Sequence, residues 1–410
     1  MVVLYYIAVK CYGLAILTAA IFHAKARLWV TGRIRWRQQI KSSLIPGESR
    51  ILFHCASLGE FEQGKPVLEA LKQNYPTHKI VLTFFSPSGY EVRKKDPLAD
   101  YVFYLPLDGP WNARDFIDLV NPTMVFFVKY DFWHFFIKEF KTRKIPIYFV
   151  SSIFRPTQIF FQPLMTFFDK MLRRVTHFFV QNQSSLELLY NRGIPQVSVT
   201  GDTRFDRVYQ NCMQLNAVPE IENFKESKKL LVAGSTWPND EKLLIRLFDS
   251  IRNECKMIVV PHEITEYRIQ QMLKKFGGNV VRYSTWDKKD FTPEILIIDN
   301  VGMLSAIYKS GDFAYVGGGF GKGIHNILEA AVFGIPVFFG PKFKKFREAN
   351  DLLHWKSAIS IRNETELINR FAEIMNDEKR LLKIKDINER YINNNKGSTE
   401  LIISFLKVNQ

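Results

Sequence analysis

Two acidic residues in the first half of the chain follow short apolar runs and could serve in proton transfer. Glu60 lies just past the apolar run at 51–56, and Asp131 lies just past the run at 124–128. A carboxylate at the end of a buried strand can point into a binding site and accept a proton. The alternative roles are structural, with Glu60 as a first-turn acid of a helix and Asp131 as a helix N-cap. The residues alone leave both alternatives open.

A glycine-rich stretch in the second half, GGGFGKGIHNILEAA from Gly317 to Ala331, looks like a phosphate-binding loop. It fails the dinucleotide fingerprint, because Lys322 or Ile324 stands where the third glycine belongs. It also fails the Walker pattern, because Val316 and Gly323 hold two of that motif's required positions. The glycines are therefore expected to let a bulky ligand approach the backbone.

The residues that follow the glycines could bind a nucleotide. We expect His325 and Asn326 to begin a helix whose free amides favour an anion, and Glu329 to accept ribose hydroxyls one turn later. Helix stabilisation is the alternative role for Glu329. Ser235 and Thr236, at the end of another apolar run, suit a phosphate. A lone histidine such as His262 is more often structural than functional.

The elements that must position these residues alternate along the chain, which is typical of parallel βαβ units. A helix is predicted to start at Pro66, because proline suits the first helical turn. Polar residues at 211–227 interrupt the alternation, so two Rossmann-like domains are predicted, with ligands at the carboxyl ends of their strands. The predicted strands cover residues 51–56, 79–85, 101–106, 124–128, 145–150, 177–182, 229–234, 256–261, 294–299, 313–318 and 336–340.

Composition agrees with a folded protein that has an anionic partner. The chain has 410 residues, of which 47% are hydrophobic and 24% are charged, enough for two or three domains. A net charge of +15 requires nucleic acid, a membrane surface or a phosphorylated substrate. The four cysteines lie far apart in sequence, which suggests neither a disulfide framework nor a zinc site.

The N-terminal segment selects the membrane among these partners. Residues 2–22 carry one charge, Lys10, and approach the length of about 20 residues that spans a bilayer core. Six basic residues and no acid follow between Lys25 and Lys41, with Trp29 and Trp36 interleaved. We predict a retained membrane anchor with the rest of the chain in the cytoplasm. A cleaved signal peptide and a buried core helix are the alternatives.

Several motifs, in this order, resemble those of the Kdo transferases, which move 3-deoxy-D-manno-octulosonic acid (Kdo) from CMP-Kdo to the lipid A precursor. The resemblance covers nearly the whole chain and implies the GT-B glycosyltransferase fold, with two Rossmann-like domains and a cleft between them. After the apolar N-terminus, the motifs are ASLGE (56–60), TFFSPSGY (83–90), YLPLD (104–108), GDTRFD (201–206), GST (234–236), GGG (317–319), HNILEAAVFGIPVFFGP (325–341) and FRE (346–348).

The resemblance assigns roles to individual residues. It makes Glu60 the proton acceptor, and Asp131 and Arg204 the groups that stabilise the transition state. Asp131 replaces the second carboxylate of the family's Glu-x-Glu pair, while Lys129 stands at the first position. The implied CMP-binding residues, together with those suggested by the glycine-rich stretch, are Ser235, Thr236, Pro261, His262, Val301, Gly302, Met303, Gly318, Gly319, His325, Asn326, Ile327, Leu328 and Glu329.

The implied enzyme is an inverting glycosyltransferase of lipopolysaccharide biosynthesis that needs neither cofactor nor metal. Its expected partners are CMP-Kdo, the lipid A precursor lipid IVA and the membrane surface. It would sit at the inner membrane through a single-pass or monotopic N-terminal anchor, and its catalytic domains would lie on the cytoplasmic side. The expected division is an anchor at 1–40, an acceptor domain at 41–210 and a CMP-Kdo domain at 211–410, whose last helix packs back on the acceptor domain.

Two other functions compete with this interpretation. One is a GT-B enzyme that uses a UDP-sugar and another lipid acceptor, since the same fold and the segment from Asn326 to Glu329 would serve it. The other is a membrane-tethered nucleic-acid-binding protein, which only the charge suggests. No basic-aromatic motif of the single-strand-binding kind supports a nucleic-acid partner.

Overall fold

The computed structural model of the chain describes residues 1–162, 166–287 and 293–409 and divides into two compact units. Unit 1 comprises residues 1–207 together with 395–410, and unit 2 comprises residues 208–394. The chain passes from one unit to the other within helix α10 (Thr203–Gln214) and again just after Asn394.

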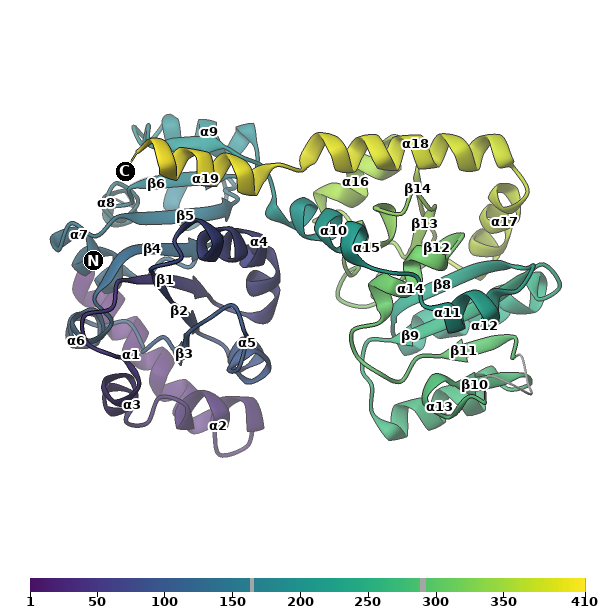
Figure 1. The fold of residues 1–410 in the computed structure, drawn as a ribbon, viewed down its shortest axis with the longest axis horizontal. Coiled ribbons are helices and arrows are strands. Elements are labelled where there is room, and N and C mark those ends of the chain that lie inside the picture. Colours follow the sequence, from purple (N-terminus) through teal and green to yellow (C-terminus); the bar gives the residue numbers. More distant parts are fainter. Residues whose placement is uncertain (163–165, 288–292, 410) are drawn as a thin grey trace. The chain divides into compact units, whose positions relative to one another are not determined.

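Unit 1 is built on a parallel sheet of seven described strands in the order β3-β2-β1-β4-β5-β6-β7 (Figure 1). Every residue of β1 is buried, which is the pattern of a parallel strand covered on both faces. The strands are β1 (Arg50–Cys55), β2 (Lys79–Phe84), β3 (Tyr101–Tyr104), β4 (Pro122–Val128), β5 (Ile147–Ser152), β6 (His177–Val180) and β7 (Val197–Val199).

The helices of unit 1 cover both faces of this sheet. Ile51 and Phe53 of β1 belong to the core beneath α4 and α19, whereas Leu52 faces the core shared with α6 and α7. The helices are α1 (Val2–Ala19), α2 (Ala24–Thr31), α3 (Trp36–Ser43), α4 (Leu58–Asn74), α5 (Pro87–Arg93), α6 (Pro110–Val120), α7 (His134–Thr142), α8 (Thr166–Leu172), α9 (Gln183–Tyr190) and α19 (Ser398–Val408).

Unit 2 repeats the architecture with a second parallel sheet of seven described strands, in the order β10-β11-β9-β8-β12-β13-β14. The strands are β8 (Lys229–Thr236), β9 (Cys255–Pro261), β10 (Val280–Arg282), β11 (Ile295–Ile297), β12 (Phe313–Val316), β13 (Val337–Phe339) and β14 (Ala358–Ser360). Its helices, besides the end of α10, are α11 (Pro219–Lys225), α12 (Pro238–Ile251), α13 (Glu266–Phe276), α14 (Leu304–Ser310), α15 (Leu328–Ala331), α16 (Arg347–His354), α17 (Glu364–Met375) and α18 (Glu378–Asn395).

The predicted fold class is confirmed, and each apolar run predicted to be a strand contains one. The sequence did not predict β7, β10 and β14, which have three residues each. Two helix starts were predicted wrongly, and both belong to the candidate site.

The N-terminal helix α1 packs against unit 1 with one side and leaves the other exposed. It is long and apolar enough to cross a bilayer, and only 11% of this apolar segment is buried inside the protein. Its inner side is held by Tyr5, whose hydroxyl donates to Asp108 Oδ2 at 2.7 Å, and by the close approach of Gly13 to Leu107. Leu4 and Ile7, with 61% and 51% of their surface exposed, lie outside this contact. The alternative of a buried core helix is therefore wrong.

Candidate active site

Glu60 and Asp131 follow neighbouring strands at the point in the unit 1 sheet where the strand order reverses. β1 pairs with β2 on one side and with β4 on the other, so chain connections leave this point in opposite directions. In open parallel sheets, ligands bind beyond the carboxyl ends of the strands at such a point. Glu60 follows β1 and Asp131 follows β4.

Glu60 lies in the first turn of α4, since this helix begins at Leu58 and not at Pro66 as predicted. Ser57 is the residue before the helix and has an extended conformation, whereas Pro66 is buried inside the helix. The apolar residues from Phe61 to Leu71 pack on the sheet, which favours continuing the helix through the proline. Glu60 Oε2 accepts a hydrogen bond from the Ala56 amide at 2.6 Å. The carboxylate thus makes the contact expected of a first-turn acid.

The surroundings of Glu60 also suit a base. Burial raises the pKa of Glu60 above its usual value, and the negative charge of Asp131 raises it further. The Ala56 amide and the charges of Lys129 and His54 act in the opposite direction. A carboxylate with a raised pKa holds a proton more strongly, which makes it a better general base near neutral pH. The capping contact and this role are compatible.

Asp131 is fixed by a histidine and a tryptophan. His54 Nε2 lies 2.8 Å from Asp131 Oδ2, and Trp133 Nε1 donates to the same oxygen at 2.9 Å. Because a carboxylate only accepts, Nε2 donates to Asp131, while His54 Nδ1 lies 2.9 Å from the Thr83 hydroxyl. Asp131 therefore does not serve as an N-cap, since Trp133 is the residue before α7.

Arg204, at the start of α10, is held by an acid that the sequence analysis did not single out. Its guanidinium contacts Asp202 Oδ2 through Nε at 2.9 Å and Nη2 at 2.7 Å. Asp202 in turn accepts from Gln63 Nε2 at 2.8 Å, which ties the pair to α4 one turn beyond Glu60. The Arg204 side chain is 31% exposed, so a ligand can still reach it.

The glycine-rich stretch lies at the matching point of unit 2, where β8 pairs with β9 on one side and β12 on the other. A Cβ atom on Gly317 would lie 2.3 Å from the Ser235 carbonyl oxygen, and one on Gly319 would lie 2.6 Å from the backbone of Gly340. Gly318 has a φ of +92°. These three glycines therefore allow backbone segments to approach each other, and the expected approach of a ligand to them stays a prediction.

The prediction that a helix begins at His325 and Asn326 is wrong. α15 begins at Leu328 and has four residues. The Asn326 side chain accepts from the Leu328 amide at 3.2 Å, and the His325 amide donates to the Gly317 carbonyl at 3.1 Å, so both residues belong to the preceding loop. Asn326 Nδ2 also donates to Glu329 Oε1 at 3.2 Å. A helix this short has only a small dipole. The polar side chains of the segment are therefore its main groups for contacting a ligand.

Two histidines and a tryptophan form a stack in unit 2. The His262 ring stacks on both Trp237 and His325, with centroids 4.8 Å and 4.3 Å away. Trp237 Nε1 donates to His325 Nε2 at 3.1 Å. Burial, and then the neighbouring His262, lower the pKa of His325 to about 4. His325 is therefore a neutral group at physiological pH, and exposed His262 adds an aromatic surface.

The remaining predicted CMP-binding residues come from the carboxyl ends of four neighbouring strands, β11, β9, β8 and β12. Val301 is 89% exposed, whereas Ile327 and Leu328 are fully buried and can offer a ligand only their backbone. The buried Thr236 hydroxyl donates to Glu241 Oε1 at 3.3 Å. Pro261 ends β9, Gly302 has a φ of +96°, and Met303 precedes α14.

The sequence missed His54, Thr83, Trp133, Asp202 and Trp237. His54 stands inside an apolar run that we interpreted only as a strand, and Thr83 opens the TFFSPSGY motif without having been given a site role, although a polar residue in a buried strand is a usable signal. Within the described residues, no group of three or more His, Cys, Asp or Glu side chains could hold a metal ion.

Two Rossmann-like domains, with candidate residues at the switch point of each sheet, define the GT-B class, and solved structures share this fold. The UDP-GlcNAc 2-epimerase from Neisseria meningitidis, bound to UDP-GlcNAc, superposes with a TM-score of 0.61 at 14% identity over 87% of this chain and 99% of that chain. The UDP-GlcNAc 2-epimerase from Methanocaldococcus jannaschii gives 0.53 at 16% identity over 84% and 98%.

Sequence comparison finds similarity to one family of enzymes. Residues 30–207 match the family model described as 3-deoxy-D-manno-octulosonic-acid transferase. The chain is 28% identical to the 3-deoxy-D-manno-octulosonic acid transferase of Aquifex aeolicus over 83% of this chain and 90% of that protein. It is 24% identical to the enzyme of the same name from Haemophilus influenzae over 88% and 87%. These matches support the Kdo transferase family, and with it a glycosyltransferase, over most of the chain.

Proposed function

We propose that the protein transfers Kdo from CMP-Kdo to the lipid A precursor, as its relatives' name and its site residues suggest. The observation that carries this proposal is the half-buried Glu60 carboxylate, whose pKa is raised in part by Asp131, at the switch point of the unit 1 sheet. A base in this position can deprotonate a sugar hydroxyl of the acceptor.

The proposed reaction is a single inverting displacement. Glu60 takes the proton of the acceptor hydroxyl as the oxygen attacks the anomeric carbon of Kdo, and CMP leaves with the electrons of the broken bond. Asp131 keeps His54 and Trp133 in place beside the base. Arg204, oriented by Asp202, offsets negative charge on the donor.

CMP is proposed to bind to unit 2 through the loops after β8, β9, β11 and β12. The ring stack of Trp237, His262 and His325 suits a flat base, and the pair of Asn326 and Glu329 suits the ribose hydroxyls. Ser235, Thr236, Pro261, Val301, Gly302, Met303, Gly318, Gly319, Ile327 and Leu328 complete the proposed donor site.

The N-terminal segment is proposed to hold the enzyme on the cytoplasmic side of the inner membrane as a monotopic anchor. α1 contacts unit 1 through Tyr5 and Gly13, and a helix that crossed the bilayer would have to give up these contacts. Its exposed apolar side can instead lie in the headgroup region. The basic residues between Lys25 and Lys41 would contact anionic lipids.

The test is incubation of the full chain with CMP-Kdo and tetraacylated lipid A precursor, followed by mass spectrometry of the lipid. The proposal predicts a mass increase of at least one Kdo residue, and no transfer would contradict it. A parallel reaction with UDP-GlcNAc tests the alternative donor. The UDP-sugar proteins share less than 25% identity with this chain, so their likeness supports the fold alone.

A further inference from the structure

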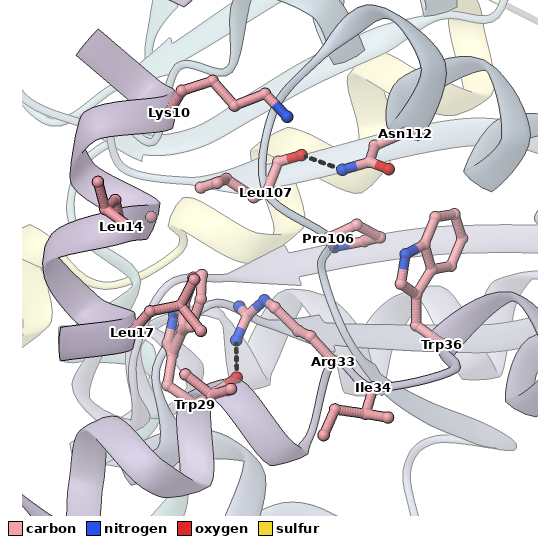
Figure 2. A pocket seen from close by; sticks show the side chains of 12 residues that line it. Lys10, Leu14, Leu17, Trp29, Arg33, Ile34, Trp36, Pro106, Leu107 and Asn112 are labelled. Carbon is pink, nitrogen blue, oxygen red and sulfur yellow. Dashed lines mark hydrogen bonds between the residues drawn. The ribbon is translucent and has the colours of Figure 1, made fainter. Parts of the chain in front are cut away.

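A cavity of about 450 Å³ lies beside α1 in unit 1 (Figure 2). Leu14 and Leu17 of α1 form one wall, and Trp29 of α2 and Trp36 of α3 form others. Pro106 and Leu107, in the loop after β3, complete the apolar lining. Cavities of this size and composition bind small organic ligands, with a few polar groups that fix orientation.

The cavity contains a cation that has no acidic partner. Figure 2 shows Arg33 among the apolar side chains, and its guanidinium donates only to backbone carbonyls, at 2.9 Å to Leu105, 3.0 Å to Trp29 and 2.8 Å to Phe85. In the described part of the chain, no carboxylate forms an ion pair with it. Burial lowers the pKa of Arg33 to about 9. The guanidinium also lies over the rings of Trp29, Tyr104 and Phe85, 3.9 Å, 4.7 Å and 5.0 Å from their centroids, which offsets part of its charge. An anion at this position would supply the ion pair that these contacts do not.

Arg33 and a second cation can both reach a ligand. An arginine has five N–H groups, and the three carbonyl contacts use three of them. Lys10 also lines the cavity, with its ammonium group 5.2 Å from the Tyr6 ring centroid, and forms no ion pair within the described residues. The combination of an apolar cavity with two cations fits an amphiphile that has an anionic head group.

The cavity is linked to the candidate active site by a short run of contacts. Phe85, whose carbonyl accepts from Arg33, lies 4.9 Å from the Trp133 ring, and Trp133 donates to Asp131. The rings of Phe85 and Trp133 therefore connect the cavity with Asp131. An acyl chain bound here would hold the head group of its lipid near Asp131. The acceptor has to occupy this position, whereas the other lipids of the bilayer do not.

We propose that this cavity binds one fatty-acyl chain of the lipid acceptor, while Lys10 and Arg33 hold a phosphate of its head group. The proposal rests on the proposed function and adds a specific binding site for the acceptor. Membrane attachment through the exposed side of α1 does not need this cavity.

The matched variants are Ile34→Trp and Ile45→Trp. Both isoleucines are 60% exposed, but only Ile34 lines the cavity. With tetraacylated disaccharide bisphosphate in detergent, Ile34→Trp should raise KM at least about tenfold, equivalent to about 1.4 kcal/mol, and Ile45→Trp should leave it unchanged. With the deacylated disaccharide bisphosphate, both variants should match the wild type. An unchanged KM for Ile34→Trp, or equal losses with both acceptors, would overturn the proposal.

A crosslinking experiment tests the cavity without requiring turnover. The probe is the same tetraacylated acceptor with a diazirine near the end of one acyl chain. After irradiation with the full chain, adducts are expected at Leu14, Leu17 or Ile34, and Ile34→Trp should reduce them while Ile45→Trp should not. Adducts confined to the outer side of α1, such as Leu4, would overturn the proposal. Since crosslinking needs no transfer, it separates failure of this inference from failure of the proposed reaction.

Discussion

Gly317→Ala is predicted to destabilise unit 2 because the glycine lets β8 and β12 approach each other. An added Cβ would lie 2.3 Å from the Ser235 carbonyl oxygen, 2.7 Å from Thr236 Cα and 2.8 Å from the Ser235 carbonyl carbon. All three are backbone atoms, so no side-chain rotation can relieve the overlap. The strand ends would have to separate.

The expected cost is about 3 kcal/mol, the upper end of the range for overpacked interiors. For a domain of this size, each kcal/mol lowers the melting temperature by about 2–4 °C, so a decrease of about 6–12 °C is expected. Differential scanning calorimetry of the full chain measures this decrease. Scans with and without CMP identify the transition of unit 2, because CMP is proposed to bind there.

Gly321→Ala is the matched control. This glycine lies four residues later in the same loop, and the nearest atom to an added Cβ, the Gly318 carbonyl oxygen, is 3.5 Å away, an ordinary contact. Its effect should stay within about 0.5 kcal/mol. A Gly317→Ala protein as stable as the wild type, or equal losses in both variants, would refute the interpretation that this glycine is required for strand packing.

Three further predictions concern the two candidate sites and the anchor. The negative charge of Asp131 raises the pKa of Glu60, so Asp131→Asn should lower it and move the acidic limb of the kcat/KM profile to lower pH; a limb that moves upward would contradict the coupling. Trp237→Phe keeps the ring but removes the hydrogen bond to His325, so CMP should bind about two- to tenfold more weakly in calorimetry, and the pKa of His325, followed by NMR, should rise above about 4; an unchanged pKa would exclude the tryptophan from this role. Ile7→Lys on the exposed side of α1 should reduce sedimentation with anionic vesicles, whereas Val92→Lys, at a similarly exposed position on α5, should not; equal binding by both variants would rule out attachment through α1.

The sequence predicted the strands well for a physical reason. Parallel strands covered on both faces are continuous apolar runs, and β1, β4 and β9 have this pattern. The three-residue β10 is half-buried throughout, and too short to stand out from a loop. Boundaries were harder, because tertiary packing carries α4 through Pro66 although proline is disfavoured inside a helix.

The candidate site could be predicted only in part. The place of Glu60 and Asp131 after strands made them candidates. The contact of Asp131 with His54 could not be predicted, because the two residues lie 77 positions apart in sequence. The Trp237 contact with His325 spans 88 positions and has no local signature. The role of the three glycines depends on backbone atoms of other strands, which no motif in the loop itself reveals.

The most direct test of the central claim is the turnover of Glu60→Gln with CMP-Kdo and tetraacylated lipid A precursor, measured by mass spectrometry of the lipid product. Glutamine keeps an oxygen that can accept from the Ala56 amide but cannot take up a proton at this position. A rate loss of about 10²- to 10⁴-fold is predicted, with CMP affinity unchanged. Turnover within about tenfold of the wild type would contradict the assignment of Glu60 as the base.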